Sequence, residues 1–422
     1  MSTTQRSNRS SRPRVVVLGG GFGGLYAARV LRAAAADVTL IDRTNHHVFQ
    51  PLLYQVATAV LAPSDIASPI RYLLRKQRNT TVLMAEVKGI DVDRRAVMLG
   101  DGTEVPYDYV IVATGSRHSY FAHPEWEPIA PGLKSIEDAR LVRHRFLSAF
   151  ELAEKSDDVA ERDALMTFVI VGGGPTGVEL AGMIPDITHH SFAADFRRID
   201  TSKTRIILVE AGPRLLPAFP EHLAKRAQRD LEELGVEIRL GSPVTNVAAD
   251  SVSIGTERIA ARSVFWAAGN VASPVVRSLG APMDRVGRVE VLPDLSIPDH
   301  PEVFVVGDLA AMKRDDGTLV PGVAQGAIQS GRMAAKNIRR LIDREPTKPF
   351  HYFNKGDLAT IGRYKAVANF PGFTIAGRIA WWFWLFLHIL YLAGFRNRLS
   401  VLLEWGYAYF TYERGARLIT KN

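Results

Sequence analysis

Cysteine is entirely absent from the 422 residues. This absence excludes disulfides, thiolate metal sites and redox relays that pass electrons through a pair of thiols. The two adjacent histidines, His46 and His47, have no further ligand at metal-binding spacing. We therefore predict no metal site and interpret both histidines as structural.

Acidic residues are absent from the first fourteen positions, which carry four arginines. Residues 376–422 hold six basic side chains against two acidic ones. Each end contributes +4 to the net charge of +8, so residues 15–375 are neutral as a whole. An excess of basic side chains that is confined to the two ends of the chain argues against a nucleic-acid groove and favours contact with an anionic membrane surface.

An apolar stretch is also missing from the N-terminus, which excludes a secretory signal peptide there. Residues 1–13 are rich in Arg and Ser and run directly into a β-branched segment. We predict that they form a solvated, disordered basic tail. The mean hydropathy of 0.00 is average, so any membrane-binding segment must be local.

The most informative feature that is present is an internal repeat. Arg14–Leu31 reads RVVVLGGGFGGLYAARVL and Thr167–Ile184 reads TFVIVGGGPTGVELAGMI. Each copy is a β-branched run, three glycines and an Ala/Leu-rich helix, the pattern of a buried parallel strand that leads into a helix. Similar strands are predicted at Asp37–Asp42, Arg205–Glu210 and Val303–Asp308, further strands at Thr80–Asp91 and Glu104–Thr114, and a helix at 323–342. This alternation predicts an α/β fold with doubly wound parallel sheets.

The first loop carries Gly19, Gly21 and Gly24 in the GxGxxG spacing. The first glycine permits the tight turn, the second lets a pyrophosphate approach the backbone, and the third lets helix and strand pack closely. Asp42 ends the next strand, where a carboxylate can accept a hydrogen bond from a ribose 2′-hydroxyl. These features predict a dinucleotide site.

The second loop repeats the spacing with Gly172, Gly174 and Gly177, and Glu210 ends the following strand. A carboxylate at this place accepts a 2′-hydroxyl and repels a 2′-phosphate, so NADH is predicted over NADPH. Arg214 lies nearby and would permit a minor use of NADPH.

Three further segments follow in order: Val110–Gly115 (VIVATG), Trp266–Asn270 (WAAGN) and Val303–Asp308 (VFVVGD). Together with the two loops they resemble the two-dinucleotide-binding flavoprotein superfamily, which includes glutathione reductase-like enzymes. Within it, Asp42–Arg71, the AQGAIQ segment Ala324–Gln329 and Phe350–Gly362 resemble type II NADH dehydrogenases, which are single-subunit NADH:quinone reductases. The missing cysteines agree, because disulfide reductases and sulfide:quinone reductases need reactive thiols.

The resemblance implies two Rossmann-like domains and a C-terminal helical membrane-binding segment. The FAD-binding domain would comprise residues 14–120 and 290–350 and hold FAD without a covalent bond. The NADH-binding domain would comprise residues 121–289, and the C-terminal region residues 351–422. The implied FAD contacts are Gly19, Gly21, Phe22, Gly23, Gly24, Asp42, Arg43, Asn45, Val87, Ala113, Thr114, Gly115, Asp308, Ala324 and Gln325. The implied NADH-site residues are Gly172, Gly174, Pro175, Thr176, Gly177, Glu179, Glu210, Ala268 and Gly269.

Three residues receive catalytic roles from the resemblance. Gln325 and Gln329 would hydrogen-bond the quinone carbonyls, and Glu179 would position NADH and handle protons. Taken without it, the two glutamines are polar residues on one solvated helix face, and Glu179 complements a helix dipole.

The C-terminal segment Ile379–Phe395 (IAWWFWLFLHILYLAGF) has 17 residues without Asp, Glu, Lys or Arg. As a helix it spans about 25 Å, short of the ~30 Å hydrocarbon core. A buried core helix and a transmembrane span are alternatives. A monotopic anchor over about residues 378–420 accounts for the length, the tryptophans and the basic flanks together. We predict that Gly394 breaks the apolar run and that a second helix follows, in which Leu399, Leu402, Leu403, Tyr409 and Phe410 share a face.

We therefore expect a non-proton-pumping NADH:quinone oxidoreductase, attached to the cytoplasmic face of a respiratory membrane and compatible with a homodimer. One alternative is a soluble NADH-dependent flavin reductase that uses oxygen or a ferredoxin-like protein. Another is a non-catalytic NADH sensor or membrane-associated partner-binding protein.

Overall fold

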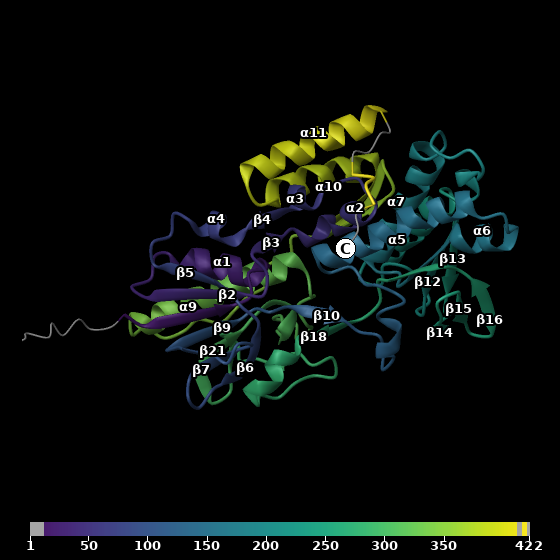
Figure 1. The fold of residues 1–422 in the computed structure, drawn as a ribbon. Coiled ribbons are helices and arrows are strands. Elements are labelled where there is room, and N and C mark those ends of the chain that lie inside the picture. The colour runs from purple at the N-terminus through teal and green to yellow at the C-terminus, as the bar shows by residue number, and fades with distance from the viewer. Residues whose placement is uncertain (1–11, 412–415, 420–422) are drawn as a thin grey trace, which may run out of the picture. The chain divides into compact units, whose positions relative to one another are not determined.

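The computed structural model describes residues 12–411 and 416–419. The chain divides into two compact units (Figure 1). The first comprises Met1–His47, Pro69–Arg117 and Val271–Phe353, and the second comprises Val48–Ser68, His118–Asn270 and Asn354–Asn422. Residues 1–11 of the predicted basic tail, and Arg414 among the C-terminal basic residues, lie outside the described residues.

The first unit is built on a six-stranded sheet in the order β20-β21-β9-β1-β2-β5. All its pairs are parallel except β20 with β21. Its buried apolar side chains form one core with the helices α1 and α9. These helices cross closely, since a Cβ on Gly331 would lie 3.0 Å from the Cα of Gly23. The elements are β1 (Arg14–Leu18), α1 (Phe22–Leu31), β2 (Asp37–Asp42), β5 (Thr80–Met84), β9 (Tyr109–Val112), β20 (Ser296–Ile297), β21 (His300–Val305) and α9 (Ala324–Ile342).

A small antiparallel sheet, β6-β7-β8, also belongs to this unit. Its strands are Val87–Asp91, Ala96–Leu99 and Glu104–Pro106. The sequence patterns suggested single strands over 80–91 and 104–114, and this is wrong. Each segment contains two strands of different sheets. In the second, Pro106 ends the ladder because proline has no N–H to donate.

The second unit contains a four-stranded parallel sheet in the order β13-β12-β11-β17. A cluster of phenylalanines lies against it, with Phe150 stacked on Phe168 at 5.6 Å between ring centres. The elements are α5 (Ile136–Lys155), α6 (Val159–Leu165), β11 (Thr167–Val171), α7 (Pro175–Asp186), β12 (Arg205–Glu210), α8 (Glu221–Glu232), β13 (Val236–Leu240) and β17 (Ser263–Trp266), with the antiparallel β14 (Val244–Val247), β15 (Ser251–Ile254) and β16 (Glu257–Ala260).

The C-terminal part of the second unit holds an antiparallel sheet that the sequence analysis did not identify: β23 (Asp357–Ile361), β24 (Lys365–Phe370) and β25 (Phe373–Gly377). Two helices follow, α10 (Arg378–Tyr391) and α11 (Phe395–Thr411), separated at Gly394, whose φ is +93°. A helix pair interrupted at this glycine was predicted, and it is confirmed.

Residues 48–68 form the platform on which α11 rests. They include α2 (Leu53–Ala57) and α3 (Pro63–Ile66), and α3 lies beside α11 (Figure 1). Asn397 donates its amide to the carbonyl of Ala67 at 2.9 Å, and Ser400 donates its hydroxyl to Asp65 at 2.8 Å. The shorter elements of the chain are β3 (His46–Val48), β4 (Ala67–Pro69), α4 (Ile70–Leu74), β10 (Ser116–His118), β18 (Asn270–Ala272), β19 (Val289–Glu290) and β22 (Ala310–Ala311).

Candidate dinucleotide and quinone sites

The first glycine loop has the geometry that its spacing predicts. Gly19 has a φ of +97°, and a Cβ there would lie 2.9 Å from the carbonyl carbon of Ala113. A Cβ on Gly24 would collide with the carbonyl oxygen of Gly19, so helix α1 packs closely on β1. At Gly21 a Cβ would meet nothing within 4 Å, which leaves the backbone at the start of α1 open to a ligand.

The second loop reproduces this arrangement within the second unit. Gly172 has a φ of +114°, and its Cβ would lie 2.7 Å from the carbonyl carbon of Ala267. A Cβ on Gly177 would collide with the carbonyl oxygen of Gly172, and Gly174 faces open space. Helix α7 begins at Pro175, which has no N–H, and the N–H groups of Thr176 and Gly177 in its first turn have no partner within the helix and are available to a ligand in this space. The internal repeat therefore extends to the geometry of the two loops.

The repeat also includes the strand ends beside each loop. Ala113, Thr114 and Gly115 follow β9, and Ala267, Ala268 and Gly269 follow β17. Gly115 and Gly269 share a φ of +70°. The Oγ1 of Thr114 is buried and has no hydrogen-bond partner among the residues that the structure describes.

Both carboxylates at the strand ends hold their own loops. Asp42 accepts from the N–H of Gly20 at 2.6 Å and from Thr44 at 2.7 Å. Glu210 accepts from the N–H of Gly173 at 2.6 Å and from the Gly212 N–H at 2.7 Å. Asp42 thus fixes Gly20 and Glu210 fixes Gly173, the central residue of each run of three glycines. The sequence pattern did not predict this structural role.

The remaining predicted FAD residues of the first unit occupy varied environments. Asp308, just after β21, accepts from the hydroxyl of Ser116 at 2.9 Å. Phe22 is buried, and Val87, at the start of β6, is half-buried. Arg43 and Asn45 are exposed.

His47 lies next to the first loop, and its environment is that of a structural residue. Its Nδ1 lies 2.9 Å from the carbonyl oxygen of Gly20, and its ring contacts Phe22 edge-on at 5.1 Å. Burial lowers the pKa of His47 to about 4, so the ring is neutral at physiological pH.

Glu179 lies on α7, two residues past Gly177, and its carboxyl is buried. Burial raises its pKa to about 8, because the carboxylate loses its hydration. The backbone N–H of Thr360 on β23 opposes this shift by hydrogen-bonding to the carboxylate. The carboxyl is therefore protonated in most molecules at neutral pH.

The two candidate quinone residues lie on the same helix. Gln325 and Gln329 are half-buried on α9, which begins at Ala324, one residue after its predicted start. Gln329 donates its amide N–H to the carbonyl of Phe353 at 2.9 Å and accepts the Phe353 N–H at 3.0 Å. Gln329 thus anchors the chain at Phe353.

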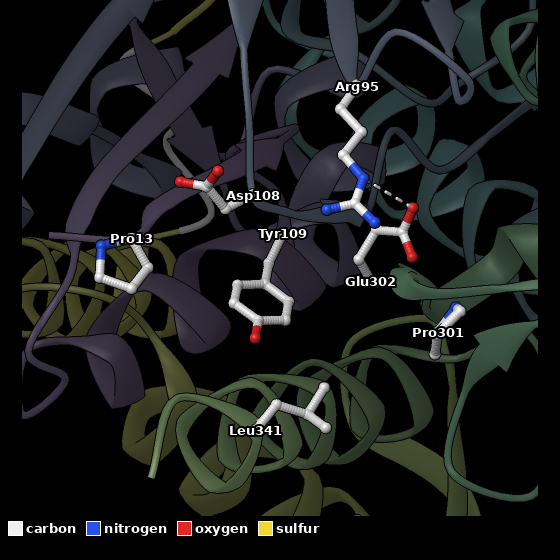
Figure 2. Close-up of a pocket in the computed structure, with 7 residues that line it drawn as sticks. All are labelled: Pro13, Arg95, Asp108, Tyr109, Pro301, Glu302 and Leu341. Atoms are coloured by element: carbon white, nitrogen blue, oxygen red, sulfur yellow. Dashed lines mark ion pairs between the residues drawn. The ribbon is translucent and has the colours of Figure 1, made fainter. Parts of the chain in front are cut away.

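A separate pocket of about 430 Å³ lies where the strands of the first unit begin (Figure 2). Asp108 and Tyr109 line it at the start of β9, and Glu302 near the start of β21 pairs with Arg95 at 3.2 Å. The glycine loop lies at the opposite, carboxyl ends of these parallel strands. This pocket is therefore distinct from the dinucleotide site of its unit.

The tail helices expose an apolar surface. Nine side chains on α10 and α11 are between 46% and 65% exposed: Ile379, Trp382, Phe383, Phe386, Leu390, Leu399, Leu402, Leu403 and Tyr407. Within residues 12–411 and 416–419, we find no helix long and apolar enough to cross a membrane. Tyr409 and Phe410, which the sequence placed on the same face, have side chains outside those described.

Comparison with known proteins now decides the family. Residues 13–331 match the family described as pyridine nucleotide-disulphide oxidoreductase, and residues 354–411 match the NDH2 C-terminal domain. The chain is 47% identical to the type II NADH:quinone oxidoreductase Ndh of Mycobacterium tuberculosis, over 97% of this chain and 90% of that protein. The chain belongs to the type II NADH:quinone oxidoreductases.

A second relative agrees with membership of this family, and a solved structure agrees with the fold. The enzyme of Haemophilus influenzae is 32% identical over 84% of this chain and 86% of its own. The structure of Plasmodium falciparum NDH2 in complex with NADH has a TM-score of 0.88 at 19% identity and covers 97% of this chain and 100% of that one. The predicted family, fold class and reaction class are confirmed, as are FAD and NADH as cofactor and substrate.

Sequence reasoning missed four residues of the second unit that form a hydrogen-bonded series near Glu179. They are Tyr54, Gln55, Thr360 and Trp405. The first three lie in the segments that carried the family resemblance. Their connection was not visible in the sequence, because up to 350 residues separate the bonded partners.

Proposed function

We propose that the chain oxidises NADH and reduces a membrane quinone in two half-reactions at the residues predicted above. The observation that carries the proposal is the matched pair of glycine loops in a chain without cysteine. Two such loops hold two dinucleotides, and without thiols the electrons pass from flavin to an acceptor that is not a disulfide. When bound, FAD supplies the redox chemistry by taking up a hydride equivalent and releasing two electrons.

The first loop fits the pyrophosphate of FAD. The open face at Gly21 lies at the N-terminus of α1, where N–H groups and the helix dipole favour phosphate. Asp42 would accept from the adenosine ribose and Asp308 from a ribityl hydroxyl. The unpaired hydroxyl of Thr114 gives a bound cofactor a further polar partner.

The second loop would hold NADH in the same way, with its pyrophosphate on Gly174–Thr176. Glu210 would accept from the 2′-hydroxyl of the adenosine ribose. Since a 2′-phosphate would meet a carboxylate already bonded to two backbone N–H groups, NADH is preferred over NADPH.

Glu179 would serve the proton balance of the reaction. NADH, one proton and a quinone yield NAD⁺ and a quinol, so one proton must come from outside the nicotinamide. A buried carboxyl with a pKa of about 8 holds that proton at neutral pH and can release it.

Gln325 would hydrogen-bond a quinone carbonyl as it gains charge. Gln329, bonded at both ends of its amide to Phe353, would act by holding the neighbouring backbone. No proton pumping is proposed, since the residues predicted for the reaction include no path across a membrane.

The exposed apolar surface of α10 and α11 would lie in the membrane interface, so that a lipid-soluble quinone reaches the enzyme from the bilayer. We propose a monotopic attachment to the cytoplasmic face of a respiratory membrane, with Arg378, Arg396 and Arg398 near anionic headgroups.

Anaerobic titration tests the function. NADH should bleach the flavin absorbance of the purified protein, and a ubiquinone or menaquinone analogue should restore it. If NADH leaves the absorbance unchanged, every enzymatic assignment fails. If oxygen or a ferredoxin-like protein restores the flavin absorbance and quinones do not, the proposal of a quinone as the electron acceptor is wrong.

A further inference from the structure

Trp405 on α11 is connected to the vicinity of Glu179 by hydrogen bonds that run through the second unit. Its indole N–H donates to the Oε1 of Gln55 at 2.6 Å, and the Nε2 of Gln55 donates to the hydroxyl oxygen of Tyr54 at 3.0 Å. The Tyr54 hydroxyl lies 3.1 Å from the Oγ1 of Thr360. The backbone N–H of Thr360 in turn interacts with the carboxyl of Glu179 and opposes the rise of its pKa.

Two of the three side-chain hydrogen bonds have a fixed direction. The indole N–H of Trp405 and the amide N–H of Gln55 are donors, whereas either hydroxyl can donate in the bond between Tyr54 and Thr360. Gln55, Tyr54 and Thr360 are each at most 5% exposed. Buried hydrogen bonds of this kind polarise one another, and breaking one of them leaves a buried group unpaired.

Glu179 lies on a helix that packs against the elements of this hydrogen-bonded series. α7 packs against α2 and β23, which present Tyr54 and Thr360. Among the described residues, only burial and the Thr360 N–H contribute to the pKa of Glu179. The charged pair of the same elements, Arg363 with Asp186 at 3.8 Å, lies at the far end of α7.

We propose that Trp405 is a positioning residue for the reaction. Trp405 contacts residues 48–68 and fixes the side chains of Gln55 and Tyr54. These side chains in turn hold Thr360, and with it the Thr360 N–H, next to the carboxyl of Glu179. Placement of the membrane-facing helix α11 is thereby coupled to the proton-handling carboxyl. This inference rests on the proposed role of Glu179 in quinone reduction.

Trp405→Phe tests the coupling, because it keeps an aromatic ring and removes only the indole N–H and part of the ring. Trp384→Phe is the matched control. The ring of Trp384 lies 5.3 Å from that of Trp405 between centres, tilted by 38°, yet its buried Nε1 has no hydrogen-bond partner among the described residues. The full-length flavoprotein is used on vesicles, with NADH and a ubiquinone analogue.

We expect Trp405→Phe to lower kcat for the quinone about three- to tenfold, the range that one buried hydrogen bond supports. The rate of flavin reduction by NADH and the fraction bound to vesicles should be unchanged. Because the carboxylate of Glu179 loses a well-placed donor, its pKa rises further. The alkaline fall of kcat should then move to higher pH by up to about one unit. Trp384→Phe should leave this profile in place.

Tyr54→Phe provides a second variant if Trp405→Phe fails to fold or leaves the membrane. It should reproduce the pH shift, and the double variant should shift no further than Tyr54→Phe alone. A pH profile equal to that of Trp384→Phe for both single variants overturns the coupling while quinone reduction persists. If the wild-type protein itself reduces no quinone, the proposed function fails instead.

Discussion

Gln329 on α9 is bonded at both ends of its amide to the backbone of a single residue, Phe353. Its Nε2 donates to the Phe353 carbonyl at 2.9 Å, and its Oε1 accepts the Phe353 N–H at 3.0 Å. Gln329 therefore has a structural task in the AQGAIQ segment, beside the quinone contact proposed for Gln325 four residues earlier on the same helix.

Replacement of each glutamine by leucine should separate these tasks. Gln329→Leu should lower the free energy of unfolding by about 1–2 kcal/mol, because two hydrogen bonds are lost. Gln325→Leu should raise KM for the quinone about tenfold, because the hydrogen bond proposed to a quinone carbonyl is lost. Denaturant unfolding and steady-state kinetics on the same preparations measure both effects. An unchanged stability in Gln329→Leu would contradict its structural task, and an unchanged KM in Gln325→Leu would contradict the proposed quinone contact.

Glu210→Ala should reduce the preference for NADH over NADPH by about tenfold or more, since the repulsion of a 2′-phosphate is removed. The KM values for both nucleotides should also rise, because the carboxylate holds the N–H groups of Gly173 and Gly212. The measurement is kcat/KM for each nucleotide with one quinone. Asp42→Ala is the control, as it alters the equivalent carboxylate of the other loop, and it should leave the ratio unchanged.

The sequence was sufficient to predict the two loops, because their geometry depends on local spacing. Gly19 and Gly172 need positive φ, and Gly24 and Gly177 have no room for a Cβ. These requirements act over a few residues and so leave a pattern in the sequence.

The second task of Asp42 and Glu210 and the series from Trp405 to Thr360 were not predictable in this way. They depend on contacts between segments that are far apart in the chain, and the series joins residues 55 and 405. The sheet β23-β24-β25 was also missed. Its strands are short, and their alternation is obscured because Ala359, Thr360 and Ile361 are all buried.

Glu179→Gln should change how stability depends on pH. The folded pKa of about 8 lies above the ordinary value of 4.5, so between these values the folded state holds a proton that the unfolded state has lost. The stability contributed by that proton is complete below pH 4.5 and is lost as the pH rises through 8. Relative to Glu179→Gln, the wild-type protein should lose about 1.4 kcal/mol for each pH unit between 5 and 8. Parallel unfolding curves across that interval would show that the carboxyl is not protonated in the folded state.

The exposed surface of the tail helices predicts two separable contributions to membrane binding. Trp382 and Phe386 on α10 are 58% and 63% exposed, and burial of such a side chain is worth about 1.5–3 kcal/mol. The double variant Trp382→Ser/Phe386→Ser should therefore weaken binding to neutral and anionic vesicles alike, by at least about tenfold.

Arg396→Gln should weaken binding to anionic vesicles only, by about fivefold, since one basic side chain near such a surface is worth about 1 kcal/mol. Leu152→Ser removes an equally exposed apolar side chain from α5 and should leave binding unchanged. Co-sedimentation with vesicles of both compositions distinguishes the variants. If Leu152→Ser weakens binding as much as the α10 double variant, attachment is not specific to the tail. If Arg396→Gln acts equally on neutral vesicles, its role is structural and not electrostatic.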